Sequence, residues 1–106
     1  METGYRRYEI LLPLKFNDGR PVPENLLADT LAEIEEKIGP LSFESQEIMG
    51  VWQHNGQTYR DKQARVFVDV PDTPENRQFF SSLKERLKSR FEQLDIWVTT
   101  HPLEIL

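Results

Sequence analysis

Two histidines and one group of carboxylates are the side chains best suited to catalysis or metal binding. His54 lies in a predicted turn and His101 follows the last predicted strand, positions where histidine is commonly solvated. Asp69, Asp72 and Glu75 could approach one another and hold a cation, although such residues more often cap helices and turns. The chain contains no cysteine, catalytic triad, P-loop or dinucleotide-binding glycine motif. We therefore expect no catalytic residue, no metal site and no cofactor.

Aromatic residues form a second group with binding potential, and a central β-hairpin over residues 41–70 would position several of them. Asn55-Gly56 is a strong hairpin signal, because both residues tolerate the positive φ of a type I′ turn. Pairing outward from this turn places Trp52 opposite Tyr59. The same register predicts three further pairs on one face, namely Leu41 with Val70, Phe43 with Val68 and Ser45 with Val66.

The other elements follow from the periodicity of the apolar residues. A first strand alternates with period two over residues 8–16, and a helix follows that ends at Gly39-Pro40. Thr73-Pro74 begins a second helix, and a last strand alternates over residues 96–100. The predicted apolar stripes are Leu27, Leu31, Ile34 and Ile38 on the first helix, and Phe80, Leu83, Leu87, Phe91 and Leu94 on the second.

The element order β-α-β-β-α-β predicts an α+β fold in a single domain over residues 1–106. Right-handed crossovers would produce a four-stranded antiparallel sheet with two helices on one face and a long central hairpin. This pattern resembles the ferredoxin-like superfold over nearly the whole chain. That superfold includes nucleic-acid binders, metal chaperones, ligand sensors and enzymes, so the resemblance alone implies no function.

Three segments also resemble, more loosely, a family of small uncharacterised bacterial proteins of that fold. They are LPLKFNDGRPVPE before the first helix, GVWQHNGQTYRDKQARVFV through the hairpin and LKSRFEQLDIWV before the last strand. None of these segments is a catalytic signature. The resemblance therefore implies a bacterial protein of this fold and carries no activity with it.

The sheet face away from the helices is the best candidate for a functional surface. A solvated antiparallel face should be polar, whereas this one is predicted to carry several aromatic residues. A large exposed apolar patch usually marks a partner or a ligand, although a cross-strand aromatic pair also stabilises a sheet locally. The candidate interface or ligand residues are Leu11, Ile48, Trp52, Tyr59, Phe67 and Trp97.

These residues favour a non-catalytic interaction or oligomerisation module, either a homodimer or a subunit of a larger complex. The alternative is a small-molecule-binding protein or enzyme, in which two sheets form an α+β barrel around a pocket. That pocket would need a polar group, for which Asp61, Arg65 and His101 are the candidates.

Nucleic acid is not expected as a partner, because the net charge is −5 and phosphate binding needs clustered Lys and Arg. An RNA-recognition motif would need two outward aromatic residues on the third strand, where only Phe67 is suitably placed. The acidic first helix and the mildly basic second helix are predicted to be solvated faces with local ion pairs, such as Glu33–Lys37 and Glu85–Lys88. The alternative is that these opposed charges meet across an oligomer.

The composition is that of a soluble globular protein, with 38% hydrophobic and 29% charged residues. No run approaches the roughly 18 apolar residues of a membrane span, and residues 1–8 lack the apolar core of a signal peptide. The absence of cysteine fits a reducing compartment. We therefore expect a cytoplasmic protein without a membrane partner.

Overall fold

The computed structural model describes the backbone of residues 4–54 and 56–106, and the side chains of residues 4–44, 56 and 63–106. The predicted element order is confirmed. The elements are β1 (Tyr5–Pro13), α1 (Glu24–Ile38), β2 (Ser42–His54), β3 (Gln57–Pro71), α2 (Pro74–Arg90) and β4 (Trp97–Leu103). None of the helices within the described residues has the length and apolar character needed to cross a membrane.

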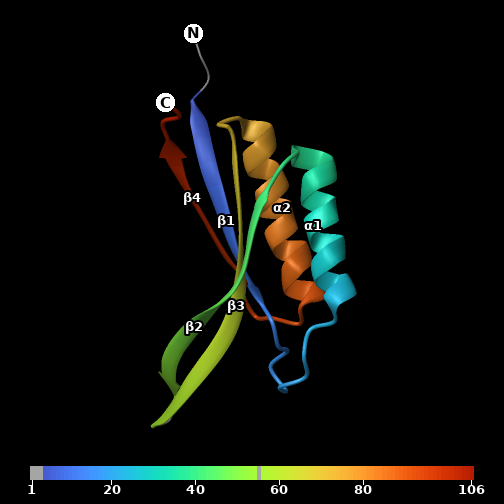
Figure 1. The fold of residues 1–106 in the computed structure, drawn as a ribbon, viewed down its shortest axis with the longest axis vertical. Helices are drawn as coiled ribbons and strands as arrows, with labels where there is room; N and C mark the ends of the chain where they lie inside the picture. Colours follow the sequence, from blue (N-terminus) through green and yellow to red (C-terminus); the bar gives the residue numbers. More distant parts are fainter. Residues whose placement is uncertain (1–3, 55) are drawn as a thin grey trace.

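The four strands form one antiparallel sheet in the order β2-β3-β1-β4. Both helices lie on the same face of this sheet, and the outer part of the β2–β3 hairpin extends beyond them (Figure 1). This is the ferredoxin-like α+β arrangement that the sequence predicts.

The core lies between this helical layer and the sheet. Alternate residues of β1 and β3 point towards the helices, as the period of two requires. Tyr8 is 3% exposed, and its ring stacks on Phe80 of α2 with 4.1 Å between ring centroids. The other buried core residues include Ile10, Leu12, Ile34, Val66, Val68, Val70, Leu83, Leu87, Phe91 and Ile96.

The ends of the helices follow their local sequence signals, with one exception. The Thr73 side chain caps α2 by accepting a hydrogen bond from the Asn76 amide at 3.2 Å, and Pro74 occupies the first helical position. The prediction that Leu94 continues the apolar stripe of α2 is wrong. The helix ends at Arg90 and Glu92 adopts a positive φ of 53°, so that the chain turns away and leaves Leu94 95% exposed.

The hairpin register is correct near the turn and wrong near the body of the sheet. Trp52 pairs with Tyr59, as predicted. The predicted pairs of Leu41 with Val70, Phe43 with Val68 and Ser45 with Val66 are wrong, because the register shifts between Glu44 and Ile48. Phe43 pairs with Val66 instead, and Leu41 precedes β2.

The cause of the shift is a bulge in β2, where residues 45–47 lie opposite residue 64 of β3. Bulges increase the local twist of a strand pair, and the hairpin bends away from the sheet in this region (Figure 1). The shift amounts to two residues, so it preserves the alternation of the two faces. Asn55 of the predicted type I′ turn lies outside the described residues.

Candidate functional site

The face of the sheet opposite the helices is the candidate functional surface, and we call it the open face. Its described residues are the odd-numbered positions of β1, of β3 from Gln63 on and of β4, since the even-numbered neighbours are buried from Tyr8 on in β1 and from Ala64 on in β3. Ser42 and Glu44 of β2 pair with Phe67 and Arg65 and therefore share this face. The described side chains from the other strands are Tyr5, Arg7, Glu9, Leu11, Pro13, Gln63, Arg65, Phe67, Asp69, Pro71, Trp97, Thr99, His101 and Leu103.

Three of the predicted interface residues come together in the middle of this face and at its edge. Leu11 of β1 is flanked by Arg65 of β3 on one side and by Trp97 of β4 on the other. Phe67 lies one row further along β3, and it is half-buried, as is Leu11. Trp97 is 63% exposed and is the largest apolar group on the described part of the face.

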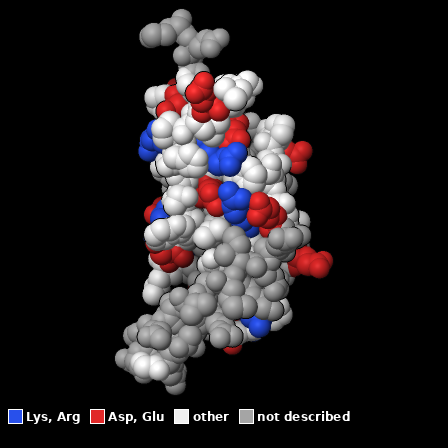
Figure 2. Space-filling view, turned by 60° about the vertical axis from the view of Figure 1, so that its left-hand side comes forward, with Lys and Arg blue, Asp and Glu red and all other residues white. Residues whose placement is uncertain are grey.

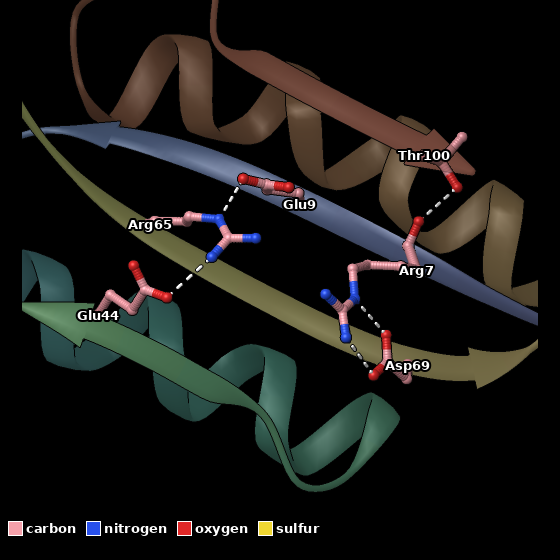
Figure 3. A network of polar contacts seen from close by, with 6 residues as sticks. All are labelled: Arg7, Glu9, Glu44, Arg65, Asp69 and Thr100. Atoms are coloured by element: carbon pink, nitrogen blue, oxygen red, sulfur yellow. Dashed lines mark hydrogen bonds and ion pairs between the residues drawn. The ribbon is translucent and has the colours of Figure 1, made fainter. Parts of the chain in front are cut away.

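A network of ion pairs runs through the open face, and the sequence analysis did not anticipate it (Figure 3). Arg7 donates two hydrogen bonds to the Asp69 carboxylate, at 2.7 and 2.9 Å. Arg65 contacts the carboxylates of both Glu9 and Glu44, the latter at 2.8 Å. These contacts join β1, β2 and β3 across the same face.

Phe67 lies between the two arginines of this network. The guanidinium carbons of Arg7 and Arg65 are 4.5 and 4.7 Å from the centroid of its ring. Both distances are within the range of cation–π contacts. The centre of the open face is therefore a layer of planar groups, with a benzyl ring held between two guanidinium groups.

The ion pairs favour the charged forms of Arg7, Arg65 and Asp69. The hydrogen bond to Asp69 raises the pKa of Arg7, and the bond to Glu9 raises the pKa of Arg65. The hydrogen bond from Arg7 lowers the pKa of Asp69, and the nearby charge of His101 acts in the same direction. A carboxylate held in its ionised form is a poor general acid, so this arrangement suits binding better than proton transfer.

Charges of both signs are interspersed on this side of the molecule. Figure 2 shows acidic and basic side chains next to one another there, without a large area of a single sign. The network itself contains two arginines and three carboxylates. Such a surface complements another mixed surface better than it complements a polyanion.

The polar residues proposed from the sequence have different positions. Arg65 lies in the network, and His101 is exposed on β4 directly opposite Arg7. The side chain of Asp61 lies outside the described residues, as do those of Ile48, Trp52, Tyr59 and His54.

Sequence reasoning missed Tyr5, Arg7, Glu9, Glu44 and Asp69 as members of the open face. Alternation along β1 and β3 was the signal that could have placed four of them there. Glu44 also shares this face in the predicted register, but its partner Arg65 depended on the bulge, which no local motif revealed.

Within the described residues, no group of three acidic or histidine side chains is placed to hold a metal ion. Asp69 pairs with Arg7, and Asp72 pairs with Arg6 at 3.1 Å. Arginine thus pairs with two of the three carboxylates that the sequence suggested as cation ligands.

The basic residues of α2 are also largely paired. Lys88 contacts Glu85 at 3.2 Å, as predicted. The predicted pairing of Glu33 with Lys37 of its own helix is wrong. Instead, the Glu33 carboxylate contacts the guanidinium groups of Arg86 and Arg90 of α2, at 2.7 and 2.9 Å. The ion pairs therefore connect the acidic helix to the basic one.

No family model matches this chain, and no curated protein does. Solved structures do match it. A phage SAM lyase in complex with S-methyl-5′-thioadenosine has a TM-score of 0.72 and 18% identity, and the match covers 96% of this chain and 84% of the lyase.

Two other solved structures match over similar lengths. The divalent cation tolerance protein CutA1 from Thermus thermophilus has a TM-score of 0.63 and 14% identity, covering 95% of this chain and 85% of that protein. The Bacillus subtilis GlnK–ATP complex has a TM-score of 0.58 and 10% identity, covering 97% and 84%. Likeness at these identities extends to the fold alone: this chain has the small α+β fold of these proteins.

Proposed function

We propose that this protein is a self-association module in which the open face of one copy packs against the open face of another. The observation that supports this most strongly is the 63% exposure of Trp97 beside Leu11 on a sheet face without helices. Exposed aromatic residues of this kind are enriched in protein interfaces. Tyr5, which is 40% exposed, adds a further aromatic group to the same face.

The available area agrees with a symmetric interface. Strands about 4.8 Å apart, with about 3.4 Å per residue along each strand, give four strands of about seven to nine residues a flat area of about 450–600 Å². A standard interface buries about 800 Å² on each partner. The relief of the side chains and the protruding hairpin would supply the difference.

The charges also favour a second copy as the partner. Because Arg7 and Arg65 already have carboxylate partners, covering the face would leave neither of them buried without a counter-charge. A two-fold axis through a mixed surface can place the arginines of one copy near the carboxylates of the other. The proposal is a homodimer formed by one chain of this sequence with a second.

The test is the molecular mass in solution, measured by sedimentation from about 1 to 100 µM. We expect a concentration-dependent dimer. Phe67→Glu, which puts a further carboxylate between the two guanidinium groups, should dissociate it while the monomer stays folded by circular dichroism. A wild-type monomer at every concentration would contradict self-association.

A second candidate function is the binding of an adenosine compound where two copies meet. Two of the structural matches carry such compounds, S-methyl-5′-thioadenosine in the SAM lyase and ATP in GlnK. In this chain, the exposed Trp97 indole and the Arg–Phe67–Arg layer offer flat surfaces for a purine.

Calorimetry with ATP and with S-methyl-5′-thioadenosine tests this second candidate. Saturable heat that disappears in Trp97→Thr would support it, and the absence of heat with both compounds would contradict it. The oligomeric state is measured in the same samples, because a site between two copies requires the dimer, whereas the dimer does not require the ligand.

A further inference from the structure

A small cavity lies between α2 and the β1–β4 edge of the sheet, on the side opposite the open face. Its volume is about 150 Å³. Pockets for drug-sized ligands measure roughly 300–1,000 Å³, so this cavity suits a molecule of only a few heavy atoms. Tyr8 and Phe80 are its buried lining residues, whereas Arg77 and Ser81 are exposed.

Tyr8 lines this cavity, and its hydroxyl group is unusual. The oxygen is buried and has no hydrogen-bond partner in the described part of the chain. The ring itself is 3% exposed and is held against Phe80. Buried hydroxyl groups are nearly always hydrogen-bonded, so this group needs a partner that the chain does not supply.

The cavity also has a surplus of positive charge. Among the described residues, Arg77 forms no ion pair, unlike Arg86 and Arg90 on the same helix. Lys84 also lines the cavity, and its ammonium group is 3.0 Å from the Asp95 carboxylate. The positive charges of Arg77 and Lys84 and the negative charge of Asp95 add up to one positive charge at the cavity. The whole chain, by contrast, has a net charge of −5.

We propose that this cavity binds a small oxyanion, a carboxylate or a phosphate group. The Arg77 guanidinium group pairs with two of its oxygens at the mouth, since its fork of N–H donors matches that geometry. The Tyr8 hydroxyl donates to an oxygen at the floor. Ser81 at the rim and Lys84 provide additional donors, with Lys84 shared between the ligand and Asp95.

The test is an NMR titration of the labelled protein with sodium phosphate and, separately, with sodium acetate. Each is added to about 20 mM at constant ionic strength set with chloride. We expect saturable shifts of the amides around the cavity with at least one anion. Saturation with phosphate, acetate or both identifies the class of oxyanion, and saturation with neither would overturn the proposal.

Three variants separate this site from general charge effects. Arg77→Gln should abolish the saturable shifts, and Tyr8→Phe should weaken binding about tenfold, the effect of one hydrogen bond to a charged group. Asp95→Asn should strengthen binding, because it releases Lys84. Arg86→Gln, which removes a paired arginine from the same helix, is the matched control and should bind as the wild type does.

Tyr8→Phe also has a readout in stability. Because its hydroxyl has no partner in the protein, this variant should melt at or above the wild-type temperature in buffer without the anion. Undiminished binding by folded Tyr8→Phe would overturn the role of the hydroxyl, and equal losses in Arg77→Gln and Arg86→Gln would overturn the site.

Discussion

Trp97→Thr should weaken self-association strongly without unfolding the monomer. A fully buried aromatic side chain removes about 150–250 Å² from water, and Trp97 is 63% exposed, so that about 90–160 Å² per copy is available. At about 25 cal/mol per Å², this corresponds to about 2–4 kcal/mol for each copy.

A symmetric dimer contains this side chain twice, but immobilising side chains on association offsets part of the gain. Taking about half of the summed value, we expect a loss of about 2–4 kcal/mol, which raises the dissociation constant at least about 30-fold. Threonine keeps the β propensity of the edge strand, so β4 should form normally.

Sedimentation equilibrium measures the dissociation constant, and thermal unfolding measured at a concentration where both proteins are monomeric checks the fold. Leu94→Thr is the matched control, because Leu94 is 95% exposed but lies in the connection between α2 and β4, outside the sheet. A wild-type dissociation constant for Trp97→Thr, or an equal loss for Leu94→Thr, would refute the reasoning.

Three further predictions concern stability and partners. Glu33→Gln removes the carboxylate that holds Arg86 and Arg90, and should cost about 1–2 kcal/mol at pH 7 in chemical unfolding. Burial acts to raise the pKa of Glu33, but the hydrogen bonds from Arg90 and Arg86 lower it overall. The stabilisation by the Glu33 carboxylate is therefore complete above the pKa of about 4.3 that glutamate has in the unfolded chain. It is lost as the pH falls through the lower pKa of Glu33 in the folded protein. The wild type and the variant should converge in acid, and a constant difference down to about pH 2 would contradict this linkage. Thr73→Ala should destabilise the protein by about 0.5–2 kcal/mol, because it removes the cap of α2, and Thr73→Ser should restore most of this loss in the same assay. The protein should not be retained on heparin above about 150 mM salt or shift oligonucleotides, since the basic residues of α2 are largely paired. A shift that disappears in a Lys84→Glu/Lys88→Glu variant would make nucleic-acid binding the leading function.

Local signals in the sequence determined the elements and their order. Thr73-Pro74 marked the beginning of α2, because a capping hydroxyl and a proline satisfy the first turn without help from the rest of the chain. Alternation in β1 and β3 identified the buried faces, since side chains of a strand point to opposite sides in turn. These features depend on neighbours within a few residues, and they were predicted correctly.

Only the tertiary structure determined which distant residues meet. The bulge before Ile48 brought Glu44 to Arg65, and no short motif indicates where a strand takes up extra residues. Glu33 had a suitable lysine one turn away on its own helix, yet the packing of α1 beside α2 gave it two arginines instead. The open face was thus predictable as a surface from alternation, whereas its ion-pair network was not, because pairing across strands and helices depends on a register and a packing geometry that form only when the whole chain folds.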